Sequence, residues 1–145
     1  MTGNLVYFKD MDQDPPHDRV LFSFTNGYHL AYDSTRKLGE IQIVESVESF
    51  VEERGLGPDA FDSDLELPAF RERIAGRRAM IKPALMDQSA IAGIGNVYTD
   101  EVLFQAKVHP RTKSKDVPEE KMAEIFAQMK EAYAQRLSAG RSPRI

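Results

Sequence analysis

The stretch that decides the fold is IKPALMDQSAIAGIGNVYTDEVLF, residues 81–104. It predicts a helical turn, then a tight Gly-Ile-Gly passage at residues 93–95, then a second helix. We expect Asn96 to be the N-cap of that second helix, because an asparagine side chain in this position accepts a backbone N–H of the next turn. The residues that continue the second helix at helical spacing are Val97, Glu101 and Phe104.

The two glycines of this passage indicate a possible anion site. Gly93 and Gly95 leave backbone N–H groups uncovered just before a helix N-terminus, where the helix dipole favours a phosphate oxygen. The spacing differs from the dinucleotide-binding fingerprint, since no third glycine follows and no parallel strand unit precedes it. A plain helix corner that needs glycine for close packing is the alternative.

Composition excludes several kinds of chemistry. The chain has 145 residues and no cysteine, which rules out disulfides, thiol nucleophiles, iron–sulfur clusters and cysteine-ligated zinc. The sequence has neither an apolar run of membrane-spanning length nor a signal-peptide pattern, so we expect no membrane association and a cytoplasmic location.

The net charge of −4 conceals an uneven distribution. Residues 1–70 carry 14 acidic and 5 basic side chains, residues 71–115 carry 4 and 9, and residues 116–145 carry 5 of each. The basic middle segment contains the stretch quoted above and can meet phosphates. On charge alone, a solvated basic face is the simpler interpretation.

The first part of the chain predicts strands. Residues 5–8 form an apolar run, and residues 19–24 alternate in polarity with the period of a strand. Asn26-Gly27 is typical of a type I′ hairpin turn into a returning strand at 28–32. We expect a fourth strand at 40–44.

Helices are predicted from residue 46 onward. Ser46 opens a short amphipathic segment that ends at Gly55, and residues 67–74 form another candidate. The clearest helix starts around Asp116 and Pro118, and we expect it to end at Gly140 before a loose tail. Its apolar stripe favours a core role over a binding groove, and comprises Met122, Ile125, Phe126, Met129, Tyr133 and Leu137.

Residues 81–104, extended through Ala106 and Val108-His109-Pro110, resemble the helix-two-turn-helix region of the formamidopyrimidine-DNA glycosylase and endonuclease VIII family of base-excision repair enzymes. The resemblance implies that Lys82 and Asn96 contact the DNA backbone at the lesion. A lysine beside a helix N-terminus suits this role, because such contacts position a duplex without reading bases.

The resemblance continues upstream of that stretch. Met1-Thr2-Gly3 is similar to the end of a family strand whose methionine fills the gap left by an everted base. The resemblance places His17 near a DNA phosphate and Arg36 opposite the orphaned base. Leu38 stands where the family has a phenylalanine wedge, and an apolar wedge still unstacks bases. The segment 55–58 resembles the linker between the family's sheet and helical domains.

The family's catalytic N-terminus and zinc ribbon have no counterpart in this sequence. Residue 2 is Thr2, where the family has a Pro-Glu pair whose proline amine attacks the sugar, so we expect no catalytic residue and no glycosylase or lyase activity. The three histidines are too scattered for a metal site, and we expect no metal or cofactor. The expected partner is double-stranded DNA, damaged or abasic.

We therefore predict an α+β fold, a partial antiparallel β-sandwich at 1–58 followed by a helix-two-turn-helix domain at 59–145. An incomplete sandwich leaves an unpaired sheet edge, so we expect residues 1–45 to be marginally stable, self-associating or complemented by another chain. Two other functions stay open. The chain can be one fragment of an active glycosylase, completed by another segment, or a non-enzymatic nucleic-acid-binding module.

Overall fold

The computed structural model describes residues 3–37 and 39–138, and these form an α+β structure. Contacts divide the chain into two units, one with the strands and one with the helices, whose boundary falls between Ile43 and Val44. The expected α+β class is confirmed. The expected domain boundary at residue 58 stays a prediction.

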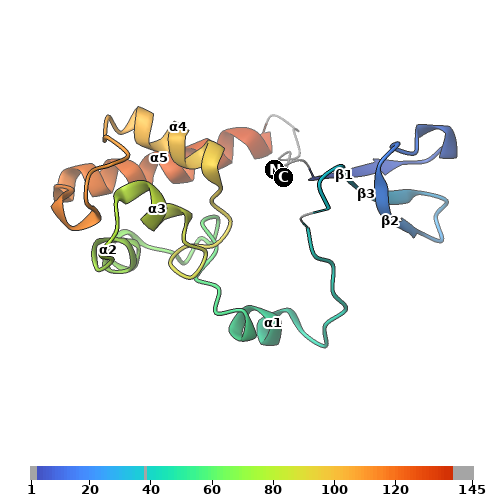
Figure 1. The fold of residues 1–145 in the computed structure, drawn as a ribbon, viewed down its shortest axis with the longest axis horizontal. Helices are drawn as coiled ribbons and strands as arrows, with labels where there is room; N and C mark the ends of the chain where they lie inside the picture. Colours follow the sequence, from blue (N-terminus) through green and yellow to red (C-terminus); the bar gives the residue numbers. More distant parts are fainter. Residues whose placement is uncertain (1–2, 38, 139–145) are drawn as a thin grey trace. The chain divides into compact units, whose positions relative to one another are not determined.

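The first unit is a three-stranded antiparallel sheet with the order β1-β3-β2 (Figure 1). The strands are β1 (Gly3–Phe8), β2 (Asp18–Ser23) and β3 (His29–Ser34), and a short 3₁₀ turn, η1 (Met11–Gln13), lies in the acidic loop between β1 and β2. Phe8 and Ala31 are buried, whereas Phe22 and Phe24 are 43% and 45% exposed. The expectation that this unit associates with another chain stays a prediction.

The hairpin between β2 and β3 differs from the expected type I′ turn. The N–H of Gly27 donates to the carbonyl of Phe24 at 3.0 Å, and of the two central residues expected to have positive φ only Gly27 has it, at +80°. The side chain of Asn26 accepts the N–H of Tyr28 at 3.0 Å. This side-chain bond holds a longer loop with a glycine bulge, which also matches strand twist.

The fourth strand expected at residues 40–44 is absent from the structure, which describes all five of these residues as irregular chain. Ile43 is fully exposed. The alternating pattern is present, but a strand exists only through hydrogen bonds to a neighbour, and no described strand pairs with this segment. The prediction of a strand here was therefore wrong.

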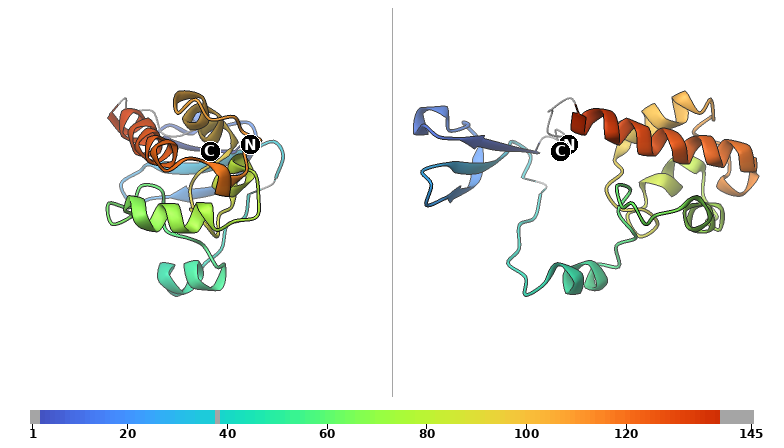
Figure 2. Two further views of the ribbon diagram at one scale, coloured as in Figure 1. Left: turned by 90° about the vertical axis from the view of Figure 1, so that its left-hand side faces the viewer. Right: turned by 180° about the vertical axis from the view of Figure 1, so that it is seen from behind.

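Within the described residues, the second unit contains five α-helices. They are α1 (Val47–Glu53), α2 (Leu67–Ala75), α3 (Ile81–Met86), α4 (Asn96–Gln105) and α5 (Glu119–Ser138), and a 3₁₀ turn, η2 (Ser114–Asp116), precedes α5. The views in Figure 2 show the long α5 lying beside α2 and α4, and the contacts between these helices confirm this packing. Helix α1 starts after Ser46 as predicted, and the hydroxyl of Ser46 caps it by accepting the N–H of Ser49.

The core of the helical unit gathers apolar side chains from α2 to α5. The predicted stripe on α5 supplies Met122, Ile125 and Met129, all with 1% exposure or less, so its core role is confirmed for these residues. Phe70 of α2 packs against Phe126 with ring centroids 5.2 Å apart. The side chains of Tyr133 and Leu137, the expected helix end at Gly140 and the tail lie outside the described residues. Among the described helices, none combines the length and apolarity needed to cross a membrane.

Candidate nucleic-acid interface

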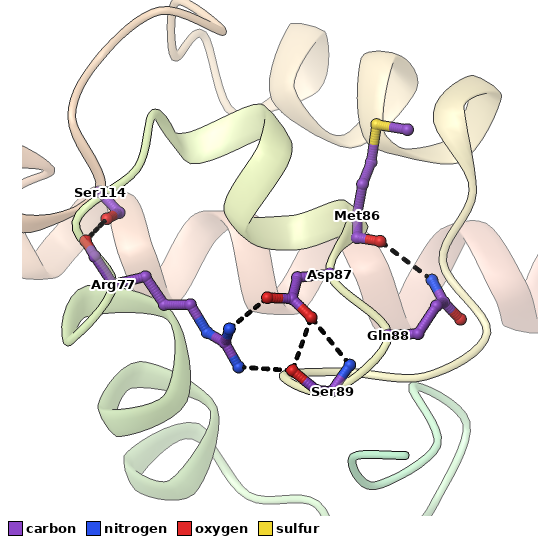
Figure 3. Close-up of polar contacts among 6 residues, drawn as sticks. All are labelled: Arg77, Met86, Asp87, Gln88, Ser89 and Ser114. Atoms are coloured by element: carbon purple, nitrogen blue, oxygen red, sulfur yellow. Dashed lines mark hydrogen bonds and ion pairs between the residues drawn. The ribbon is translucent and has the colours of Figure 1, made fainter. Parts of the chain in front are cut away.

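A hydrogen-bonded turn joins α3 to α4. The carboxylate of Asp87, directly after α3, accepts the backbone N–H and the hydroxyl of Ser89 at 2.9 and 2.6 Å (Figure 3). Arg77 binds the other oxygen of the same carboxylate and donates to the Ser89 hydroxyl at 3.0 Å. The Ser89 hydrogen bonds, followed by the Arg77 charge, lower the pKa of Asp87 below its ordinary value. This cluster fixes the start of the turn.

The linker before α2 packs against this turn. The N–H of Gly57 donates to the carbonyl of Gln88 at 2.8 Å, and the N–H of Ala92 donates to the carbonyl of Pro58 at 2.9 Å. A side chain on Gly57 would place its Cβ only 2.5 Å from the carbonyl oxygen of Ala90. The glycine of the linker is therefore required for the close approach of two backbones.

The Gly-Ile-Gly passage takes its shape from Gly93 and Gln88. Gly93 has φ +89°, a conformation that other residues rarely adopt. The side chain of Gln88 accepts the Gly93 N–H at 3.0 Å and donates to the carbonyls of Ile94 at 2.9 Å and Met86 at 3.2 Å. The sequence did not predict this role of Gln88, because no local sequence pattern distinguishes a glutamine whose side chain bonds to the backbone across a turn. Since the Gly93 N–H already donates to Gln88, the donors for an anion lie further on, at Gly95 and in α4.

Helix α4 begins one residue earlier than expected, so the prediction that Asn96 is its N-cap was wrong. Gly95 occupies the N-cap position with φ −108° and ψ −179°, and Asn96 is the first helical residue, with an exposed side chain. The shape that Gly93 and Gln88 give the turn sets this start. None of the described side chains caps the helix. Its first-turn N–H groups have no intrahelical acceptor, and a phosphate can supply one.

Gly95 differs from Gly57 in its surroundings. A Cβ built on Gly95 meets no atom within 4 Å, and its φ is one that any residue adopts. Packing inside the chain therefore does not account for a glycine here. A glycine is, however, what the close approach of a ligand to the helix N-terminus requires.

Lys82 reaches this helix from α3. The start of α3 is fixed to the basic loop before η2, since the N–H of Ile81 donates to the carbonyl of Thr112 at 2.7 Å. The Lys82 ammonium lies 2.6 Å from a carboxylate oxygen of Asp100 on α4. Asp100 follows Asn96 by four residues, which puts both on one face of α4. The structure thus brings Lys82 into contact with a residue that lies one helical turn from Asn96.

The remaining predicted residues belong to the strand unit. The carbonyl of His17 accepts the N–H of Ser34 at 3.0 Å, and the Ser34 hydroxyl accepts the N–H of Lys37 at 3.2 Å. His17 and Arg36 therefore flank the end of β3, and both are exposed. Met1 and Leu38, the predicted lesion probes beside Arg36, lie outside the described residues. Within residues 3–37 and 39–138, no group of three acidic or histidine side chains could hold a metal ion.

A short helix, a hydrogen-bonded turn and an uncapped second helix define the helical unit as a helix-two-turn-helix domain. Residues 56–143 match the model of the formamidopyrimidine-DNA glycosylase H2TH domain. The chain belongs to the formamidopyrimidine-DNA glycosylase family, which confirms the resemblance seen in the sequence.

Curated relatives agree with this assignment. A formamidopyrimidine-DNA glycosylase of Streptococcus pneumoniae is 33% identical over 144 residues, which cover 98% of this chain and 53% of the relative. One of Moorella thermoacetica is 35% identical over 140 residues, covering 95% of this chain and 51% of the relative. The chain thus spans about half the length of these relatives.

Solved structures of the family share the fold. The Lactococcus lactis enzyme bound non-covalently to DNA with an abasic site has a TM-score of 0.82 and 27% identity, covering 98% of this chain and 55% of that one. A structure of MutM with DNA containing carbocyclic 8-oxo-G has a TM-score of 0.80 and 28% identity, with coverage of 98% and 54%.

Proposed function

We propose that this chain is the DNA-binding portion of a formamidopyrimidine-DNA glycosylase-like repair protein, and that it binds damaged or abasic duplex DNA through phosphate contacts. The observation that carries the proposal is the uncapped N-terminus of α4 at Gly95 and Asn96, with the ammonium of Lys82 held on Asp100 one helical turn further along the same helix. Backbone N–H groups, an amide and a lysine bind a phosphate without reading a base. The relatives bound to abasic or damaged DNA support the same partner.

The proposal assigns lesion recognition to the strand unit. Arg36 and His17 supply positive charge and a hydrogen-bonding ring at one end of the sheet, and Met1 and Leu38 are the proposed apolar wedges. Base excision is not part of the proposed activity of this chain by itself. The roles proposed for Lys82, Asn96 and Arg36 are contacts with DNA and include no step that breaks a bond.

The test is a salt-dependent binding titration on a duplex with one abasic site, run with the full chain. We expect Lys82→Ala with Asn96→Ala to lower the affinity and to flatten the dependence of log K on log salt by about 0.9 for each DNA phosphate that the variant no longer neutralises. Lys121→Ala is the matched control, because Lys121 is also in a 2.6 Å ion pair, with Glu124 on α5. Unchanged affinity and slope in the double variant would refute the phosphate contacts. A borohydride-trapped covalent adduct with the unaltered chain would refute the proposed lack of lyase activity.

A further inference from the structure

An ion pair connects the two helices of the candidate interface. The Lys82 ammonium and the Asp100 carboxylate are 2.6 Å apart, and the Lys82 side chain is only 27% exposed, whereas that of Asp100 is 53% exposed. The lysine stem is therefore largely covered, and its charged end is held on the surface of α4. An acidic residue at this place is unexpected on charge alone, because it reduces the positive potential that attracts DNA.

The geometry shows what the carboxylate does for the lysine. The backbone of Lys82 is fixed, since its N–H donates to the carbonyl of Pro110 at 3.4 Å, but its side chain has four rotatable bonds. Asp100 follows Asn96 by one helical turn and lies on the same face of α4. Binding to Asp100 therefore holds the ammonium one helical turn from Asn96, on the face of α4 that Asn96 shares. One of its three N–H groups donates to Asp100, and two remain for a phosphate.

We propose that Asp100 is a positioning residue, which holds the Lys82 ammonium beside Asn96 so that both contact the same DNA phosphate. This inference rests on the proposed function. Without the carboxylate, the lysine regains its rotamer entropy and must lose it again on binding. The opposite role, a negative charge that only repels DNA, predicts the opposite sign for the effect of removing it.

Glu101 offers a matched control for the charge. It is the next residue on α4, it is exposed, and its carboxylate accepts a hydrogen bond from the side chain of Gln105 at 2.8 Å. Asp100→Asn and Glu101→Gln each remove one negative charge from the same helix with little change of shape. Only Asp100→Asn removes the partner of Lys82.

The experiment measures the affinity of the full chain for an abasic-site duplex over a range of salt concentrations, together with thermal unfolding. We expect Asp100→Asn to weaken binding roughly three- to tenfold, although it makes the protein less negative. Its salt slope is expected to flatten by up to about 0.9, as in Lys82→Met. Glu101→Gln is expected to bind as well as the unaltered chain or better. Asp100→Asn in the Lys82→Met background is expected to cause no further loss of affinity.

The outcomes separate this inference from the proposed function. If Lys82→Met leaves affinity and slope unchanged, or the unaltered chain binds no duplex, the phosphate contact and the inference both fail. If Lys82→Met weakens binding while Asp100→Asn strengthens it to the same extent as Glu101→Gln, only the positioning role of Asp100 is refuted. Asp100→Glu keeps a carboxylate and is expected to retain binding. A loss of affinity in Asp100→Glu equal to that in Asp100→Asn would also refute the positioning role.

Discussion

Replacing Gly95 by aspartate should strengthen helix α4 and weaken DNA binding at the same time. Gly95 is the N-cap of α4, its backbone is extended, and a Cβ there meets nothing within 4 Å. An aspartate therefore fits without strain and can accept an N–H of the first turn. Its negative charge also lies at the positive end of the helix dipole. The carboxylate then occupies the place that the proposal assigns to a phosphate.

The expected magnitudes have opposite signs. A charged cap at an exposed helix end is worth about 0.5–1 kcal/mol over glycine, so Gly95→Asp should raise the free energy of unfolding by that amount. A carboxylate about 5 Å from a phosphate repels it by about 1–3 kcal/mol, and affinity for duplex DNA should fall at least about fivefold.

Urea unfolding measures the first quantity, and a binding titration at low salt measures the second. Gly95→Ser is the uncharged control, which adds a cap without repulsion and should weaken binding less than Gly95→Asp. A Gly95→Asp chain that is more stable and binds DNA as before would show that no phosphate approaches this helix end. The assignment of a phosphate site to the N-terminus of α4 would then be wrong.

Three further predictions concern stability. Lys107 follows the C-cap residue of α4, Ala106, and has φ +55°. Lys107→Gly should therefore stabilise the chain by about 1 kcal/mol in urea unfolding. A destabilised variant would show that the lysine side chain compensates for its backbone strain. Gly57→Ala should destabilise the chain by about 1–3 kcal/mol in the same assay, because its Cβ would meet the Ala90 carbonyl oxygen at 2.5 Å. Full stability of this variant would indicate that the linker moves freely. Asp87→Asn should lower stability at neutral pH. Because the folded-state pKa of Asp87 is lowered from 3.8, its contribution is complete above that value and is lost as pH falls through the folded-state pKa. The difference between Asp87→Asn and the unaltered chain should thus shrink in acid, and a difference that is constant with pH would assign it to shape and not to charge.

Local signals in the sequence predicted much of the helical unit. The start of α1 after Ser46, its end near Gly55 and the buried stripe on α5 each depend on residues within one or two turns. Such short-range preferences survive folding when tertiary contacts agree with them. The resemblance to the family adds the expectation that Lys82 and Asn96 contact DNA, which spacing alone did not supply and which stays a prediction.

The errors arose where distant residues decide the local structure. The segment 40–44 has a strand pattern, but no described strand pairs with it. Asn96 is a favourable N-cap by type, yet the helix starts after Gly95, because the turn before it is held by Gln88. The pairing of Lys82 with Asp100 spans 18 positions, and no periodicity of the sequence connects them. These features depend on the fold and could not be found before it.

The three glycines around the α3–α4 turn differ in why a glycine is needed. Gly57 allows two backbones to approach, and Gly93 supplies a positive φ, so the structure of the chain itself requires both. Gly95 meets neither condition, and serine or aspartate would cap the helix better. A residue that costs helix stability and gains nothing in packing calls for another explanation. An approaching phosphate provides one, since it needs the N–H groups uncovered and supplies the acceptor that a side-chain cap would otherwise supply.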